Sequence, residues 1–144
     1  MRLLVDGYNV LHAWPELKQL LPVSLEYARD SLLERLAVYQ QVVDDEVIVI
    51  FDARRVIGGK NTAELRDGVQ VIFSRGSDSA DHLIERLAYE ALNSGAMVEV
   101  ATSDRTQRDL VRGMGGAVID AIELQRRVGE AEAQLERTVK RYQA

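Results

Sequence analysis

Four short segments of this sequence carry aspartates in places where a divalent metal ion could be held. Asp6 and Asp52 each follow an apolar run, and Asp81 and Asp104 come after a third and a fourth such run. Carboxylate oxygens are the ligands that Mg²⁺ prefers in proteins. Carboxylates that gather in one place raise one another's pKa unless a positive charge lies among them. If the fold brings these segments together, the sequence predicts a divalent cation site.

Such a site could cleave phosphodiester bonds without a nucleophilic side chain. A divalent cation activates water and stabilises the negative charge that develops on the phosphate. The chain has no cysteine and only two histidines, so it offers few other nucleophiles or bases. The lack of cysteine also excludes disulfides and thiolate zinc sites, and it favours a reducing, cytoplasmic location.

Four further polar residues are expected to support the site. Asn9 offers a neutral oxygen and amide donors, and Glu85 lies one helical turn after Asp81, on the same helix face. Ser103 is expected chiefly to cap a helix, and it could also contact a phosphate at that helix N-terminus. Asp52 alone could simply begin a loop, so only the convergence of the whole set favours a metal site.

Basic residues in the same segments could bind a nucleic acid around the acidic centre. The net charge of −5 argues against a protein that coats nucleic acid through a large basic surface, but a local basic rim is compatible with it. An aromatic ring at the rim could stack on a base. The predicted nucleic-acid-binding residues are Tyr8, Arg54, Arg55, Lys60, Arg75, Arg105 and Arg108.

Strands that alternate with helices predict an α/β fold built on a mainly parallel sheet. We expect strands over residues 2–5, 46–52, 69–73, 96–101 and 117–119. The expected helices begin at Ser24, at Ser77 or Asp78, at Ser103 and at Asp120, which has Glu123 as its capping-box partner. Residues 53–68 are expected to form a loop. The helix that begins at Ser77 or Asp78 is expected to end before Gly95, and the helix that begins at Ser103 is expected to end before Gly115 and Gly116.

The predicted sheet would bring the acidic segments to one place. In open parallel sheets, ligands bind beyond the carboxyl ends of the strands, and the first four strand exits here all deliver a carboxylate. The length of 144 residues fits one domain over residues 1–144. No apolar stretch approaches the roughly 18 residues of a membrane span, and the N-terminus becomes acidic too early for a signal peptide.

The ordered set of four segments resembles the YacP-like branch of the NYN domains, within the wider PIN-like nuclease group. The resemblance runs from residue 2 into the last helix. The segments that carry it are Asp6-Gly7-Tyr8-Asn9, Phe51-Asp52-Ala53, Ala80-Asp81-His82-Leu83-Ile84-Glu85 and Ala101-Thr102-Ser103-Asp104.

The resemblance implies a three-layer α/β/α sandwich of PIN-like type and an endoribonuclease that uses Mg²⁺ or Mn²⁺ to hydrolyse RNA. It matches Asp6, Asp81 and Asp104 to the metal-binding catalytic aspartates of the family. It matches Asn9, Asp52 and Glu85 to supporting positions.

Other function classes fit the motifs less well. A phosphatase with an aspartyl nucleophile would need a second acid where Tyr8 stands, and a nucleotide-cofactor domain would need a glycine-rich turn after the first strand. A receiver domain would need a lysine after a late strand, where Asp120 and Ala121 stand. An RNA-binding or ribosome-associated adaptor that keeps the fold without turnover remains open, as does the oligomeric state. In either function we expect a structured RNA, the ribosome or another RNA–protein assembly to supply specificity.

Overall fold

The computed structural model describes residues 1–53, 60–75 and 79–143. Its strands are β1 (Arg2–Asp6), β2 (Glu46–Asp52), β3 (Thr62–Arg66), β4 (Val69–Ser74), β5 (Val98–Ala101) and β6 (Ala117–Ile119). Its helices are α1 (Gly7–Ala13), α2 (Pro15–Lys18), α3 (Leu25–Val43), α4 (Ala80–Asn93), α5 (Arg105–Gly113) and α6 (Ala121–Gln143).

The strands form one sheet in the order β3-β4-β2-β1-β5-β6. All neighbouring pairs are parallel except β3 and β4, so the expected mainly parallel sheet is confirmed. From β1 the chain adds β2 on one side, and β5 later pairs with β1 on the other side. The strand order therefore reverses between β1 and β5, which is where open parallel sheets bind their ligands.

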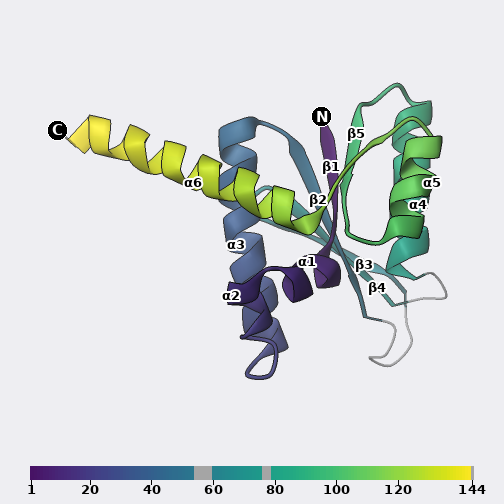
Figure 1. The fold of residues 1–144 in the computed structure, drawn as a ribbon, viewed down its shortest axis with the longest axis horizontal. Coiled ribbons are helices and arrows are strands. Elements are labelled where there is room, and N and C mark those ends of the chain that lie inside the picture. Colours follow the sequence, from purple (N-terminus) through teal and green to yellow (C-terminus); the bar gives the residue numbers. More distant parts are fainter. Residues whose placement is uncertain (54–59, 76–78, 144) are drawn as a thin grey trace.

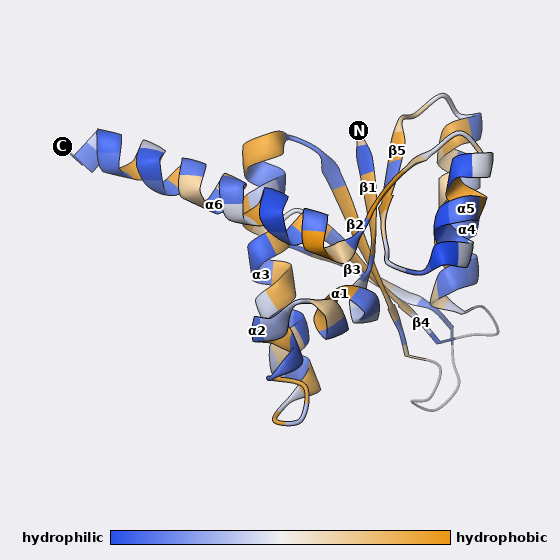
Figure 2. Ribbon diagram, viewed as in Figure 1, coloured by the Kyte–Doolittle hydropathy of each residue, from blue (hydrophilic) through white to orange (hydrophobic). Residues whose placement is uncertain are grey.

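The sheet separates two apolar cores, because successive residues of a buried strand point to opposite faces. On β1, Leu3 and Val5 pack with α1, α3 and α6, whereas Leu4 packs with α4 and α5. The ribbon shows this sandwich, with α3 and α6 on one side of the sheet and α4 and α5 on the other (Figure 1). Apolar colours run along the central strands between the two helical layers (Figure 2). The expected α/β/α layering is therefore confirmed.

The edge strand β3 was not predicted, because residues 53–68 were expected to form a loop. All five of its residues are exposed, so it lacks the buried positions by which a strand is recognised. The sequence did carry a signal for the turn after β3, because an Asp-Gly pair is typical of two-residue hairpin turns. Asp67 and Gly68 both have the positive φ that such a turn requires. The charged residues Glu64 and Arg66 suit an edge strand, because they discourage pairing with another sheet.

The helix starts differ from expectation in three places. Asp104, rather than Ser103, caps α5, since its carboxylate accepts from the Gln107 N–H at 3.0 Å. Ser79 caps α4, whereas the predicted caps Ser77 and Asp78 lie outside the described residues. The short helices α1 and α2 were not predicted, because neither is long enough to show a helical repeat. The predicted caps Ser24 and Asp120 are confirmed, each accepting from the N–H three residues later.

The only tryptophan, Trp14, joins the N-terminal helices to the start of α6. It is fully buried, and its indole N–H donates to the Ala121 carbonyl at 2.6 Å. The Arg35 guanidinium lies 5.0 Å from the centre of its ring and forms ion pairs with Glu16 and Glu132. The Trp14–Ala121 hydrogen bond therefore joins the segment after β1 to the segment after β6. None of the helices described is long and apolar enough to cross a membrane.

We expect Trp14→Phe to lower the free energy of unfolding by about 2 to 4 kcal/mol, because the buried Ala121 carbonyl loses its donor and the smaller ring leaves a cavity. Urea unfolding monitored by circular dichroism measures this change, because the variant lacks the only tryptophan and fluorescence cannot be used. Tyr27→Phe, at a ring that is 60% exposed, is the control and should change stability by less than about 0.5 kcal/mol. Equal stability of the two variants would contradict a structural role for Trp14.

Candidate functional site

Asp6 lies at the carboxyl end of β1 and is the centre of the candidate site. One of its carboxylate oxygens accepts from the Asn9 N–H at 3.4 Å, which makes Asp6 the N-cap of α1. The other accepts from the Thr102 hydroxyl at 3.5 Å. Both hydrogen bonds are long, and both donors are neutral, so they satisfy the carboxylate only weakly. Asp6 therefore retains capacity to bind a cation.

The pKa of the Asp6 carboxyl is raised from its ordinary 3.8 to about 6, chiefly by burial. The negative charges of Asp81 and Asp104 contribute to this rise, while the hydrogen bonds from Asn9 and Thr102 oppose it. Asp81 of α4 and Asp104 at the start of α5 thus lie near enough to Asp6 of β1 to act on it electrostatically. This is the convergence that the spacing of the acidic segments predicts.

Two buried side chains link these aspartates. The Thr102 hydroxyl, which donates to Asp6, also accepts from the Asp104 N–H at 3.2 Å. The Gln107 side-chain amide lies 3.4 Å from an Asp81 carboxylate oxygen, and its backbone N–H donates to Asp104. The Gln107 amide oxygen is buried, and no residue that the structure describes forms a hydrogen bond with it. Gln107 thus orients Asp81 relative to Asp104 and leaves one acceptor unused within the site.

Asn9 and Ser103 have structural connections that the sequence did not reveal. The Asn9 side-chain oxygen accepts from the Ser103 N–H at 2.9 Å, which ties α1 to the segment after β5. The Ser103 hydroxyl lies 3.5 Å from the Ala121 N–H at the start of α6. Both residues therefore hold the β1 and β5 exits side by side. The expected cap role of Ser103 for α5 is wrong, and Asp104 performs it.

The packing beneath the site explains the glycine after Asp6. A Cβ atom on Gly7 would lie 2.3 Å from the Phe51 ring, so a larger residue would force the two apart. The Tyr8 ring packs on the same Phe51 ring, with centroids 5.2 Å apart, and its hydroxyl accepts from Arg29 at 3.2 Å. Part of the Tyr8 surface expected to stack on a base is thus engaged in packing.

The other supporting acids remain predictions. Asp52 ends β2, next to β1, and it is half-buried with a partner of its own. Glu85 lies on α4 one turn after Asp81 and is half-buried. Both stand at positions from which the carboxyl edge can be reached.

The predicted basic rim is partly described. Lys60 is exposed just before β3, and Arg75 follows β4, where its N–H donates to the Asn61 side chain at 2.9 Å. Arg105 is exposed at the start of α5, and Arg108 is half-buried one turn later. Arg54 and Arg55 lie outside the described residues. The four described cations flank the aspartates on both sides along the sheet edge.

Sequence reasoning gave no role to Thr102, Gln107 or Arg29. Thr102 lies inside a recognised motif, and Gln107 stands three residues after Asp104, where a capped helix offers its N–H. Arg29 lies beside the buried Ala28 on the apolar side of α3, an unusual place for a cation. The sequence therefore indicates the roles of these three residues only weakly, and their contacts in the structure are needed to identify them.

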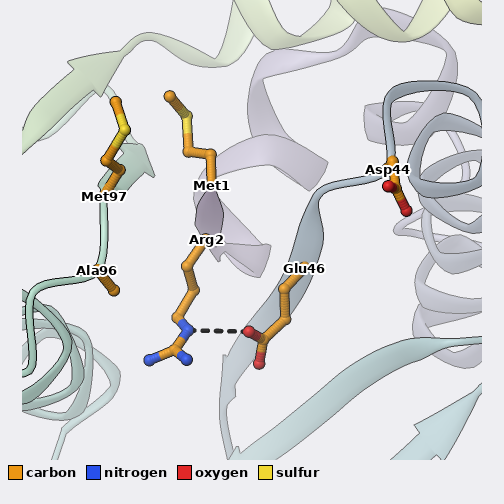
Figure 3. Close-up of a pocket in the computed structure, with 6 residues that line it drawn as sticks. All are labelled: Met1, Arg2, Asp44, Glu46, Ala96 and Met97. Carbon is orange, nitrogen blue, oxygen red and sulfur yellow. Dashed lines mark hydrogen bonds and ion pairs between the residues drawn. The ribbon is translucent and has the colours of Figure 1, made fainter.

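A hollow of about 340 Å³ lies at the amino ends of the strands, away from Asp6, Asp81 and Asp104 (Figure 3). One wall carries the ion pair between Arg2 and Glu46, with 3.0 Å between nitrogen and oxygen. Arg2 begins β1, whereas Asp6 ends it, so this hollow is separate from the candidate site. Its lining residues are Met1, Arg2, Asp44, Glu46, Ala96 and Met97.

The residues present fit a divalent cation that keeps much of its water. Among the residues that the structure describes, no three acidic, histidine or cysteine side chains are arranged to hold a metal ion directly. Mg²⁺ commonly uses one or two carboxylates and retains several waters. The weakly satisfied Asp6, with Asp81 and Asp104 nearby and Gln107 offering an unused acceptor, supplies that kind of oxygen-rich environment.

Comparison with known proteins gives consistent matches over nearly the whole chain. Residues 3–144 match the family described as the YacP-like NYN domain. The chain is 41% identical over 139 residues to the uncharacterized protein YacP of Bacillus subtilis (strain 168), covering 96% of this chain and 81% of that protein. The crystal structure of Rae1 (YacP) from Bacillus subtilis has a TM-score of 0.84 at 40% identity, covering 99% of this chain and 81% of the other. A mutant of Rae1 gives a TM-score of 0.85 at 40% identity, covering 100% and 84%.

We expect the metal-free Asp6→Asn variant to be more stable than wild type at pH 8, and the difference to shrink as the pH falls. Because folding raises the Asp6 pKa from 3.8 to about 6, ionisation of this carboxyl favours the unfolded chain as the pH rises through that window. The advantage of Asn should therefore be about 2 kcal/mol larger at pH 8 than at pH 4. Asparagine also keeps the helix cap.

Urea unfolding in EDTA at the two pH values measures this difference. Asp109→Asn, at an exposed residue of α5, is the control and should show no such dependence on pH. An Asp6→Asn advantage that is the same at pH 4 and pH 8 would mean that Asp6 is not desolvated.

Proposed function

Because the chain belongs to the family of YacP-like NYN domains, we propose that it is an endoribonuclease that hydrolyses RNA phosphodiester bonds with Mg²⁺ or Mn²⁺. NYN and PIN-like domains are generally nucleases. Cleavage would occur at the carboxyl edge of the sheet, between the exits of β1 and β5.

The links that bring Asp6, Asp81 and Asp104 together at the carboxyl edge carry the proposal, and the raised pKa of Asp6 supports it. A carboxylate that is desolvated and repelled by two others is costly for the fold, and its described hydrogen-bond donors are weak and neutral. A divalent cation would compensate this cost and lower the Asp6 pKa again. Structural ion pairs elsewhere in the chain, such as Arg127 with Glu99, already have their countercharge.

The chain's own residues have distinct roles in this proposal. Asp6, Asp81 and Asp104 would hold the cation, which supplies charge neutralisation at the phosphate and activation of the attacking water. Thr102 and Asn9 hold Asp6 in place, and Gln107 holds Asp81. Asp52 and Glu85 are proposed as outer supporting acids, and Ser103 as a residue that positions Asn9.

RNA is the proposed substrate because the rim offers arginines and an aromatic ring beside the acids. Lys60, Arg75, Arg105 and Arg108 would contact backbone phosphates, and the exposed part of Tyr8 would contact a base. Arg54 and Arg55 keep their predicted role in RNA binding. The rim is small and the chain is acidic overall, so a ribosome or another RNA–protein assembly is proposed to help select the target.

We expect Asp81→Asn and Asp104→Asn each to lower RNA cleavage at least about 100-fold, because each removes charge that holds the cation. Both substitutions keep the shape of the side chain, and Asn at position 104 keeps the cap of α5. Cleavage of mixed labelled RNAs with Mn²⁺ or Mg²⁺, and with EDTA as the metal-free control, measures the effect.

The matched control is Asp109→Asn, which removes the same charge from the exposed face of α5 and should cleave as wild type does. Equal cleavage by all variants would identify a contaminating nuclease. Wild-type protein that binds RNA without cutting it, in either metal, would favour the non-catalytic RNA-binding or ribosome-associated adaptor.

We expect Mn²⁺ to raise the melting temperature of wild type by about 5 to 10 °C at 100 times its dissociation constant. The rise should be smaller at pH 5 than at pH 8, because a proton competes for Asp6 below its pKa of about 6. Thermal unfolding of wild type and Asp6→Asn measures this. The same rise in both proteins would place the bound metal elsewhere.

A further inference from the structure

Arg29 lies among aromatic side chains close to the acidic site. Its guanidinium carbon is 5.4 Å from the centre of the Phe73 ring and 6.0 Å from that of Phe51. One of its N–H groups donates to the Tyr8 hydroxyl at 3.2 Å. Contacts to residues of α1, β2 and β4 therefore fix the orientation of this half-buried cation on α3.

A second guanidinium lies against the same ring. The Arg75 guanidinium carbon is 5.8 Å from the centre of Phe73, and its Nε atom is buried with no hydrogen-bond partner among the described residues. The backbone N–H of Arg75 donates to the Asn61 side chain, which fixes the backbone at Arg75. Phe73 thus brings together two cations that come from different elements.

In the part of the chain that the structure describes, neither cation has a carboxylate partner. By contrast, Arg35, Arg66, Arg126 and Arg127 form ion pairs with Glu16, Asp30, Glu123 and Glu99, at nitrogen–oxygen distances of 2.6 to 2.7 Å. Each guanidinium is partly buried against the Phe73 ring without a countercharge, and a partly buried charge with no countercharge is costly. An anion in contact with both would supply the missing countercharge.

The position of this pair points to the anion. Phe51 and Phe73 are register partners near the carboxyl ends of β2 and β4, and Tyr8 follows Asp6 by two residues. The pair thus lies along the same sheet edge as Asp6, on the side away from β5. An RNA strand whose scissile phosphate sits at Asp6 would pass over this edge.

We propose that Arg29 and Arg75, oriented by Phe73 and Tyr8, form a subsite for a backbone phosphate of the RNA strand next to the one that is cleaved. This inference rests on the proposed function and adds Arg29, which no motif indicated. A guanidinium held against aromatic rings is weakly hydrated, and it loses little freedom when it forms paired hydrogen bonds to phosphate. The arginines would therefore contribute to affinity and to the placement of the strand.

The test is RNA binding without cleavage. Fluorescence anisotropy of a labelled single-stranded RNA, in EDTA and separately in Ca²⁺, would give dissociation constants at several salt concentrations. We expect Arg29→Gln to weaken binding about fivefold or more, and to lower the slope of log affinity against log salt by about 0.7, the value for one phosphate contact. Arg29→Lys should keep the slope and lose affinity about threefold, because it keeps the charge but not the planar donors.

The matched control is Arg66→Gln, which makes the same change of charge at an arginine already paired with Asp30 at 2.7 Å. It should bind RNA within about twofold of wild type, since its charge is already matched. Tyr8→Phe changes no charge and removes only the hydroxyl that orients Arg29, so it should weaken binding by about twofold to threefold.

Two further readouts separate this inference from the proposed nuclease. Arg29 variants should keep the Mn²⁺-induced rise in melting temperature, because the aspartates are untouched. If Arg29→Gln does not fold, Arg29→Lys and Tyr8→Phe carry the test. Folded Arg29 variants that bind RNA as wild type does would overturn the subsite and leave Arg29 as a packing residue of Tyr8. A wild-type protein that binds no RNA in EDTA or in Ca²⁺ would overturn it as well, whereas binding lost with Arg29 but without any cleavage would reject only the nuclease.

Discussion

The desolvated carboxylate at the end of β1 is the constraint around which the rest of the site is arranged. β1 is flanked by strands on both sides and by helices on both faces, so its last residue leaves the sheet in a poorly hydrated place. A charge in such a place needs compensation, and the described contacts of Asp6 supply only neutral donors at long distance. Thr102, Asn9 and Gln107 bring two more carboxylates near it instead of a cation. The fold thus holds an electrostatic conflict at one edge, which is typical of sites that bind metal ions.

At the opposite edge of the same sheet, charged groups form ion pairs. The N-terminal ammonium group lies 3.7 Å from Asp45, Arg2 pairs with Glu46, and the buried Glu99 pairs with Arg127 of α6 at 2.7 Å. These pairs match the charges of the N-terminus, Arg2 and Glu99 with opposite ones. The contrast between the two ends of β1 supports a functional origin for the unmatched acids, because the fold can neutralise buried charge where nothing else requires it.

Most of the architecture could be predicted from the sequence, because the buried strands are continuous apolar runs and the long helices repeat at 3.6 residues. The order of the strand exits also predicts that Asp6, Asp81 and Asp104 lie near one another. The edge strand β3 and the helices α1 and α2 could not be predicted, since exposure and short length remove the periodic signal. The roles of Thr102, Gln107 and Arg29 depend on contacts between residues that are distant along the chain. Local patterns carry no information about such contacts.

The sheet divides the apolar interior into two cores, and the site draws on both of them. Asp6 ends β1 between the two cores and Asn9 lies on α1, which packs on the first core, whereas Asp81 and Gln107 come from α4 and α5, which pack on the second. Proteins open in local units whose stabilities differ. Detachment of α4 and α5 would therefore disperse the acid cluster while Trp14 and its helical layer stayed intact. On heating, the acid cluster can then be lost before the whole molecule melts, and the fluorescence of its single tryptophan would not register this first event.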